Sequence, residues 1–224
     1  AGFDACATAA MREAENGTEI IQRIRNETGI NIRIINGLEE AEIIRSANGF
    51  PIPEGRDITM FIDLGGGSTE ISVLKNDEVI DAQSFKIGTL RLLSKKVPDG
   101  EWGKLEKWLT NFKKDFGRIN VIGSGGNINK IAKIYGNPEN KTLTFTKLEY
   151  AYKHLKSFTL QERIKLLGMR PDRADVIVPA ANVFLFICRI IKVEDILVPK
   201  IGLADGLVYK IYENHLHKKK KEKK

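Results

Sequence analysis

The sequence predicts an α/β fold with mixed sheets, and three observations indicate this class. Segments of alternating or β-branched residues at 58–62, 70–74 and 78–85 follow one another with short turns between them, as antiparallel strands do. A further strand-like segment at 119–122 runs through glycines into helical sequence. Apolar residues at helical spacing recur in most of the remaining chain. We therefore expect helices packed against a sheet.

The elements follow in order along the chain. Before the strand cluster we expect a helix, a strand and a second helix, at 5–28, 31–35 and 39–47. Pro51, Pro53 and Gly55 then predict a linker between two lobes. After the strand cluster we expect a helix at 102–116, the strand at 119–122, a helix at 128–134, two or three helices within 146–192, a strand at 194–198 and a last helix at 202–216. The aromatic stripe at 102–116 is interpreted as core packing rather than as a platform for stacking bases.

Composition and charge narrow the class of protein. The 224 residues are 42% hydrophobic and 29% charged, which suits one large domain or two lobes with a packed core. The net charge of +7 is concentrated at the end, where residues 218–224 are six Lys and one Glu. We interpret this tail as disordered, and a tether for polyanions is the alternative. No specific nucleic-acid partner is expected.

The expected location rests on the cysteines and on the apolar segments. Cys6 and Cys188 have no CxxC or metal-ligand neighbour, so a reducing, cytoplasmic compartment is the default. The apolar stretch 176–193 is interrupted by Pro179 and Arg189, which predicts a buried helix rather than a membrane span. The chain starts in helical sequence without a secretory signal or an initiator Met, so we expect it to be cut from a longer one.

The strongest chemical signal is a glycine loop within Asp63–Glu70. Gly65, Gly66 and Gly67 cost backbone entropy, and a turn without Cβ atoms can aim several N–H groups at one point. Such a nest binds phosphate oxygens, and the Ser68 hydroxyl can add a donor. The loop is therefore a predicted phosphate site, with an ordinary glycine hairpin as the alternative.

Two acids flank these glycines. Asp63 ends the incoming strand and Glu70 begins the outgoing one. Carboxylates beside a phosphate site would repel the ligand unless a divalent cation lies between them, and Mg²⁺ is the natural choice. Asp63 and Glu70 are the predicted metal ligands, with solvated turn acids as the alternative.

A second glycine loop lies between a strand and a helix. It consists of Gly123, Ser124, Gly125 and Gly126. Helix N-termini bind anions through free N–H groups and the helix dipole. One such loop is a weak signal, but two in one chain, each after a strand, are more specific. Together they predict a ligand with several phosphates held from two sides.

Glu39 and Glu40 stand at the start of a predicted helix. Acids in a first turn are common partners of the helix dipole, and for Glu40 the alternative is a general base that deprotonates water. Spacing alone leaves both interpretations open. The chain has no GxxxxGK[ST] segment, and its His and Cys residues lie outside the glycine loops. This argues against P-loop, phosphohistidine and cysteine-phosphatase mechanisms.

Six segments together resemble the exopolyphosphatase and guanosine-pentaphosphate phosphohydrolase (Ppx/GppA phosphatase) family. In chain order they are Ala7–Asn16 (ATAAMREAEN), Asn36–Ala41 (NGLEEA), Phe61–Glu70 (FIDLGGGSTE), Gly123–Asn127 (GSGGN), Arg173–Pro179 (RADVIVP) and Gly202–Gly206 (GLADG). The resemblance covers residues 5–212 in order. It implies the actin, sugar-kinase and Hsp70 type of fold, with two ribonuclease H-like lobes.

The resemblance also implies a reaction and roles for residues. The family hydrolyses terminal phosphoanhydride bonds of inorganic polyphosphate or guanosine pentaphosphate with Mg²⁺. By resemblance, Glu40 activates the attacking water, while Asp63 and Glu70 organise metal and water. Both glycine loops bind phosphate, and Arg12 and Arg173 are implied phosphate contacts.

The lobes are assigned by the same resemblance. Residues 1–53 are expected to be the remnant of a first lobe, 54–201 the second lobe, 202–217 a helix packing back on the first, and 218–224 the tail. The family's first phosphate loop would lie upstream of residue 1. Ala180 stands where Gly is usual, and Ala204-Asp205 where Arg-Glu is usual. We therefore expect an enzymatic parent protein, and weak or no activity from this chain alone.

Two other functions stay open at this point. One is a non-catalytic module that binds polyphosphate or a nucleotide polyphosphate. The other is a sugar or acetate kinase of the same superfamily, against which the Glu39-Glu40 pair argues. The residues do not separate the two phosphohydrolase substrates. A homodimer stays open beside a monomer, and no membrane partner is expected.

Overall fold

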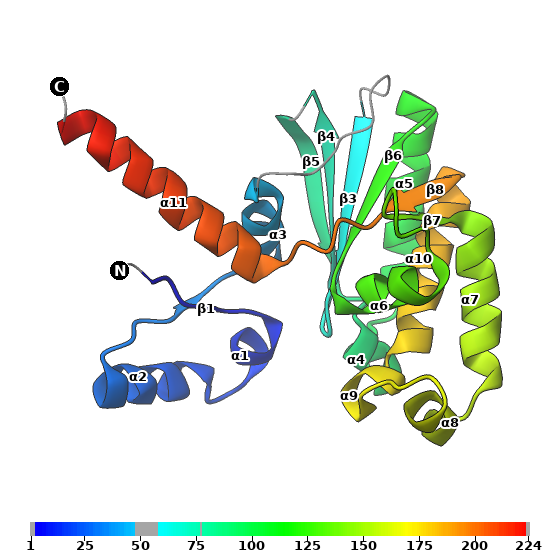
Figure 1. Ribbon diagram of the computed structural model, residues 1–224, viewed down its shortest axis with the longest axis horizontal. Coiled ribbons are helices and arrows are strands. Elements are labelled where there is room, and N and C mark those ends of the chain that lie inside the picture. Colours follow the sequence, from blue (N-terminus) through cyan, green and yellow to red (C-terminus); the bar gives the residue numbers. More distant parts are fainter. Residues whose placement is uncertain (1–2, 48–57, 77, 223–224) are drawn as a thin grey trace. The chain divides into compact units, whose positions relative to one another are not determined.

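The computed structural model describes residues 3–47, 58–76 and 78–222. The chain divides into two compact units, one formed by residues 1–51 and 201–224 and the other by residues 52–200. Figure 1 shows their helices and strands and labels most of them. The linker predicted at Pro51, Pro53 and Gly55 lies outside the described residues.

The first unit combines a short parallel strand pair with helices. Its elements are β1 (Cys6–Ala7), α1 (Ala9–Glu13), α2 (Gly17–Thr28), β2 (Arg33–Ile34), α3 (Gly37–Ser46) and α11 (Leu203–Glu222). β1 and β2 pair in parallel. The predicted strand and second helix are present, as β2 and α3, and β2 is shorter than expected.

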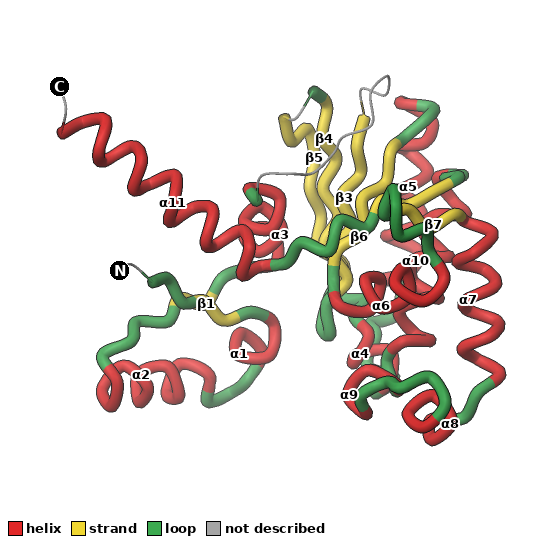
Figure 2. The backbone as a smooth tube through the Cα atoms, in the orientation of Figure 1, coloured by secondary structure: helices red, strands yellow, loops and turns green. Residues whose placement is uncertain are grey.

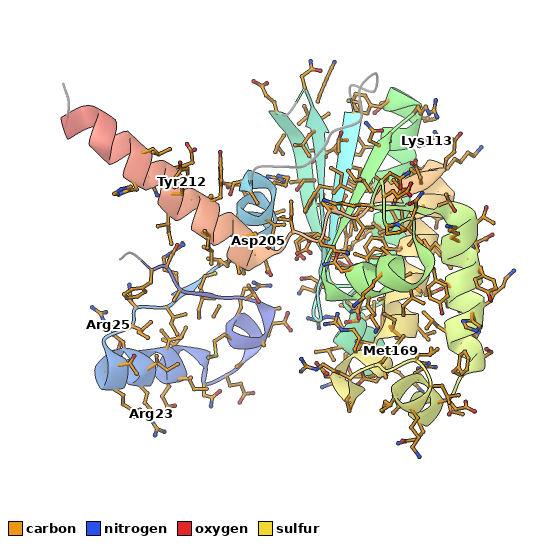
Figure 3. All side chains as sticks on the ribbon, viewed as in Figure 1. Arg23, Arg25, Lys113, Met169, Asp205 and Tyr212 are labelled. Atoms are coloured by element: carbon orange, nitrogen blue, oxygen red, sulfur yellow. The ribbon has the colours of Figure 1, made fainter. Side chains whose placement is uncertain are left out.

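The single helix expected at 5–28 is wrong. Residues 6 and 7 form strand β1, and the helical sequence is broken between α1 and α2. At Gly17 a Cβ atom would lie 2.1 Å from the main-chain oxygen of Met11, so the glycine allows a tight turn there. After the turn, α2 carries exposed side chains such as Arg23 and Arg25 (Figure 3).

Helix α11 packs against α3 within the first unit. A Cβ atom at Gly206 would lie 1.9 Å from the main-chain oxygen of Ile43, so this glycine lets the two helices approach closely. The Lys210 ammonium donates to Glu42 Oε1 at 3.0 Å beside this crossing. The structure continues α11 to Glu222, where we expected disorder from residue 218; lysine is a good helix former.

The second unit is built on a six-stranded sheet in the order β5-β4-β3-β6-β8-β7. Its strands are β3 (Ile58–Leu64), β4 (Thr69–Lys75), β5 (Glu78–Phe85), β6 (Asn120–Ser124), β7 (Thr142–Thr144) and β8 (Asp195–Leu197). β3, β4 and β5 form the predicted antiparallel meander (Figure 2), whereas β6 runs parallel to β3 and to β8. The short strand β7, antiparallel to β8, was not predicted.

The helices of the second unit pack against this sheet and form the hydrophobic core with it. They are α4 (Thr89–Leu93), α5 (Glu101–Phe116), α6 (Gly126–Tyr135), α7 (Phe145–Ser157), α8 (Leu160–Lys165), α9 (Pro171–Ala174) and α10 (Ile177–Ile191). α10 packs against α4, α5, α6 and α7. The aromatic stripe of α5 packs on the same core, which confirms its interpretation.

The apolar segment around α10 is a core helix in this fold. Residues 171–191 are long and apolar enough to cross a membrane, judged by length and composition alone. Within the unit, however, 61% of its most apolar window is buried. The prediction of a buried helix is confirmed.

Candidate active site

The first glycine loop is a hairpin turn between antiparallel strands. β3 and β4 pair in a register that places Asp63 opposite Glu70. The Gly65 N–H donates to the main-chain oxygen of Ser68 at 3.0 Å and closes the turn. Two acids and a glycine turn therefore meet at one end of the hairpin, as their spacing predicted.

The carbonyl groups of this loop are held by the start of α4. Donors from three successive residues reach them: Thr89 N–H to Gly65 O (3.0 Å), Leu90 N–H to Gly66 O (2.9 Å) and Arg91 Nε to Gly67 O (2.8 Å). In a trans peptide the C=O and the following N–H point in opposite directions. The N–H groups of Gly66, Gly67 and Ser68 therefore point away from α4. A phosphate nest requires in addition that such N–H groups converge on one point.

Gly88 allows the start of α4 to lie this close to the loop. A Cβ atom on Gly88 would lie 2.2 Å from the main-chain oxygen of Gly66 and 2.3 Å from the carbonyl carbon of Gly67. The Thr69 hydroxyl also donates to the main-chain oxygen of Ile87, next to Gly88. The backbone at Gly88 thus contacts the backbone of residues 66 and 67 directly, and the residues that follow β5 stabilise the conformation of the loop.

Asp63 and Glu70 are both buried, with 6% and 2% of their surfaces exposed. The Ser68 hydroxyl donates to Glu70 Oε1 at 2.6 Å, and the Ser84 hydroxyl donates to the same oxygen at 2.9 Å. Burial, followed by the negative charge of Glu70, raises the pKa of Asp63 from 3.8 to about 6, against the lowering effect of a hydrogen bond with Ser124. The two carboxylates are therefore close enough to repel each other in a poorly solvated place.

This pair fits a divalent cation, because a positive charge would offset both the burial and the repulsion that raise the pKa of Asp63. Mg²⁺ is usually held by one or two carboxylates together with phosphate oxygens and waters. Among the residues that the structure describes, His, Cys, Asp and Glu form no group of three or more that could hold a metal. In the described residues, Asp63 and Glu70 could thus supply two carboxylate ligands and leave further positions to phosphate oxygens or water.

The second glycine loop lies beside the first because β6 runs parallel to β3. The register pairs Ser124 with Asp63. Gly125 follows with a φ of +106°, and a Cβ atom there would lie 2.9 Å from the main-chain oxygen of Leu64. Only a residue without a side chain allows this approach. Helix α6 then begins at Gly126, so its free N–H groups open next to Asp63.

The guanidinium group of Arg173 lies at the start of α6. A Cβ atom at Gly126 would be 2.2 Å from Arg173 Nη1, and this nitrogen donates to Asn127 Oδ1 at 3.4 Å. A helix N-terminus and a cation therefore converge, which favours an anion. Arg163 pins the neighbouring segments by donating to the main-chain oxygens of Leu155 (2.9 Å), Phe158 (2.9 Å) and Ala174 (2.8 Å).

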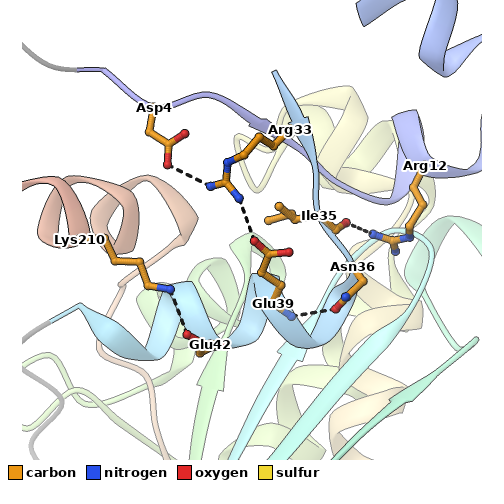
Figure 4. Close-up of polar contacts among 8 residues, drawn as sticks. All are labelled: Asp4, Arg12, Arg33, Ile35, Asn36, Glu39, Glu42 and Lys210. Carbon is orange, nitrogen blue, oxygen red and sulfur yellow. Dashed lines mark hydrogen bonds and ion pairs between the residues drawn. The ribbon is translucent and has the colours of Figure 1, made fainter. Parts of the chain in front are cut away.

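Two predicted site residues, Arg12 and Glu40, belong to the first unit. Arg12 Nη1 donates to the main-chain oxygen of Ile35 at 2.7 Å, and Glu39 Oε1 forms an ion pair with Arg33 at 2.9 Å (Figure 4). Glu39 is thus engaged with a local cation, whereas Glu40 follows it in the first turn of α3. The structure brings the other predicted residues together in the second unit, and the roles of Arg12 and Glu40 stay predictions.

Sequence reasoning missed the residues that support the loops. They are Ser84, Gly88, Arg91 and Arg163. Gly88 was visible as a glycine shortly after a strand, and this was a signal for a close backbone approach. The partners of the two arginines are distant carbonyl groups, which carry no local sequence signal.

The fold defines a class of protein: an α/β fold with a mixed six-stranded sheet and two glycine loops at the ends of the neighbouring strands β3 and β6. Comparison with known proteins narrows the class. The model of the Ppx/GppA phosphatase family matches residues 3–215, so the chain belongs to this family. The predicted family and fold class are confirmed.

Solved structures and curated relatives agree with this assignment. The crystal structure of the Aquifex aeolicus family member has a TM-score of 0.75 and 26% identity, covering 95% of this chain and 74% of that one. Exopolyphosphatase 1 of Mycobacterium leprae is 28% identical, covering 91% of this chain and 66% of the relative. The guanosine-5'-triphosphate,3'-diphosphate pyrophosphatase of Aliivibrio fischeri is 22% identical, covering 94% and 45%. The chain therefore spans between about half and two thirds of these two curated relatives, and about three quarters of the Aquifex structure.

Proposed function

We propose that this chain carries the phosphate-binding part of a Mg²⁺-dependent phosphohydrolase that cleaves terminal phosphoanhydride bonds. Inorganic polyphosphate and guanosine pentaphosphate are the proposed substrates. The observation that carries the proposal is that both glycine loops lie next to Asp63. The first loop has its carbonyl groups bonded to the start of α4, and the second loop leads into helix α6. The family and the names of the relatives support the same reaction.

In this proposal the residues divide the work between binding and proton transfer. The amides of residues 65–68 and 123–126 hold phosphate oxygens, and Arg173 neutralises part of their charge. Asp63 and Glu70 hold Mg²⁺, which when bound stabilises the negative charge that develops on the transferring phosphoryl group. Glu40 accepts the proton of the attacking water. Arg12 is the proposed phosphate contact from the first unit.

Phosphate release from both substrates tests this function. The chain is assayed with polyphosphate and with guanosine pentaphosphate, each with Mg²⁺ and with EDTA, and inorganic phosphate is measured. We expect release only with Mg²⁺ and at a low rate, in line with the weak activity expected of this chain alone. Binding of either substrate in calorimetry without any release would support a non-catalytic module instead, and neither binding nor release would refute the assignment of the loops.

Matched variants test the proposed base. Glu40→Gln keeps the shape of the side chain and removes the proton acceptor, so we expect at least a 100-fold loss of kcat with little change of KM. Glu39→Gln is the control, because Glu39 lies on the same helix and pairs with Arg33. Equal rates for the two variants would remove Glu40 from the mechanism.

A further inference from the structure

Glu70 receives a hydrogen bond from outside its own motif. Ser84, on the edge strand β5, is the direct neighbour of Glu70 across the β4–β5 pair. Its hydroxyl donates to Glu70 Oε1 at 2.9 Å, and the Ser68 hydroxyl donates to the same oxygen at 2.6 Å. The carboxylate is therefore held through Oε1 by two donors, one from the loop and one from a strand.

The two donors differ in what they do when a phosphate arrives. A serine hydroxyl has one proton, so it can donate to one acceptor at a time. Ser68 is a proposed phosphate ligand, and a phosphate oxygen in the loop would compete with Glu70 for that proton. Ser84 lies on β5, outside the glycine loop, and keeps its bond to Oε1.

We propose that Ser84 is a positioning residue that fixes the Glu70 carboxylate through Oε1 while Ser68 turns to the phosphate. The Glu70 carboxylate would then keep one orientation toward a bound metal, with and without substrate. The inference rests on the proposed function, since it gives Glu70 and Ser68 the roles described there. It adds a residue from β5 to the part of the proposed site that lies in the second unit, which otherwise consists of Asp63, Glu70, the two glycine loops and Arg173.

The surroundings of Ser84 set the size of the expected effect. Ser84 is exposed and lies at a surface pocket of about 560 Å³ whose other walls include Phe85, Glu101, Lys104 and Trp108. Glu70 itself is only 2% exposed, so water can take the place of a lost Ser84 hydroxyl only from the exposed side of β5, and only in part. The exposure of Ser84 also leaves room for the extra methyl group of threonine. We expect a moderate loss in Ser84→Ala and recovery in Ser84→Thr.

The chain offers a matched control in Ser72. This residue lies on β4 in the same hairpin, it is 1% exposed, and its hydroxyl has no hydrogen-bond partner among the described residues. Ser72→Ala thus removes the same atom from the same strand pair without touching Glu70. It separates a general effect on the hairpin from an effect on the carboxylate.

The test measures phosphate release and metal binding in all three variants. We expect Ser84→Ala to lower kcat by about 5- to 20-fold, the loss of one partly replaceable bond to a charged group, and to raise the Mg²⁺ concentration needed for half-maximal rate. KM for polyphosphate and the melting temperature should stay near those of Ser72→Ala. Binding of Mn²⁺ followed by electron paramagnetic resonance gives a second readout that does not depend on turnover, and Ser84→Ala should weaken it by a few-fold.

The outcomes separate this inference from the proposed function. If the unmodified chain releases phosphate or binds Mn²⁺, and Ser84→Ala behaves like Ser72→Ala in both assays, the positioning role is wrong and the function stands. If Ser84→Ala and Ser84→Thr are equally impaired, the hydroxyl is not the cause and the role is again wrong. If the unmodified chain neither releases phosphate nor binds Mn²⁺, the proposed function fails and the inference fails with it.

Discussion

The two glycine loops expose N–H groups by different means. The loop at 65–68 joins antiparallel strands, and it depends on residues 88–91 to hold its carbonyl groups. The loop at 123–126 joins a strand to a helix, and α6 itself supplies the free N–H groups. The first loop is thus shaped by a distant segment and the second by the helix that follows. We therefore expect the first loop to be sensitive to mutations in residues 88–91, called its brace below. We expect the second loop to be sensitive to mutations that affect Arg173.

The largest effect is expected at Asp63, the residue that lies between both loops. Asp63→Asn removes a proposed metal ligand and should lower kcat by on the order of 100-fold or more. The same change should stabilise the metal-free protein at neutral pH. The pKa of Asp63 in the folded state is raised to about 6. The free energy of unfolding of the wild-type protein therefore falls as the pH rises from about 4 through 6, because the buried carboxyl group must then ionise.

Urea unfolding in EDTA checks the stability of Asp63→Asn. The variant should exceed the wild type by up to about 2–3 kcal/mol above pH 6, and the difference should vanish below about pH 4. Asp115→Asn, on the exposed face of α5, is the control for removing a charge. A variant that is less stable than the wild type at pH 7 would show that Asp63 is well compensated and not strained by burial.

Breaking the brace of the first loop should have the next largest effect. The new Cβ in Gly88→Ala would meet the backbone of residues 66 and 67, which cannot rotate away, so we expect a loss of about 3 kcal/mol in the free energy of unfolding. Gly103→Ala on α5 is the control, because a Cβ there meets nothing within 4 Å. It should stabilise the helix by about 0.5–1 kcal/mol. Comparable stability of the two variants would mean that the loop does not need its close contact.

The contrast between the loops also shows what sequence could and could not predict. The glycine turns, the strands around them and α6 follow from local turn chemistry and residue periodicity. Strand β1 is two residues long and exists through its pairing with β2, so the helical pattern at 5–28 hid it. The hydrogen bonds from Arg91 and Ser84 join residues 24 and 14 positions apart. Such contacts depend on the three-dimensional fold, and the sequence of the loop carries no trace of them.

Mutation of the second loop should affect substrate binding through the side chain of Arg173 rather than through a backbone contact. In Gly126→Ala the new Cβ meets the guanidinium of Arg173, which is the flexible end of a side chain and can move. We expect about a 10-fold rise in KM for polyphosphate with a melting temperature near that of the wild type. Arg173→Ala should raise KM to a similar extent, and the double variant should add little to either. Additive effects would indicate that glycine and arginine act separately.

The smallest effect is expected at the edge of the brace, where Glu101 accepts the Lys86 N–H at 2.8 Å and pairs with Lys104 at 3.1 Å. Burial acts to raise the pKa of Glu101, but the hydrogen bonds from Lys86 and Lys104 outweigh it and the pKa is lowered. Because the folded pKa lies below the unfolded value of 4.5, the stabilisation is present above that pH and is lost as the pH falls through the folded pKa.

Glu101→Gln should therefore cost about 1 kcal/mol at pH 7 and progressively less below pH 4.5 in urea unfolding. Glu106→Gln, on the exposed face of the same helix, should cost almost nothing at any pH. If Glu101→Gln leaves stability unchanged at pH 7, the bonds of Glu101 to Lys86 and Lys104 do not stabilise the unit.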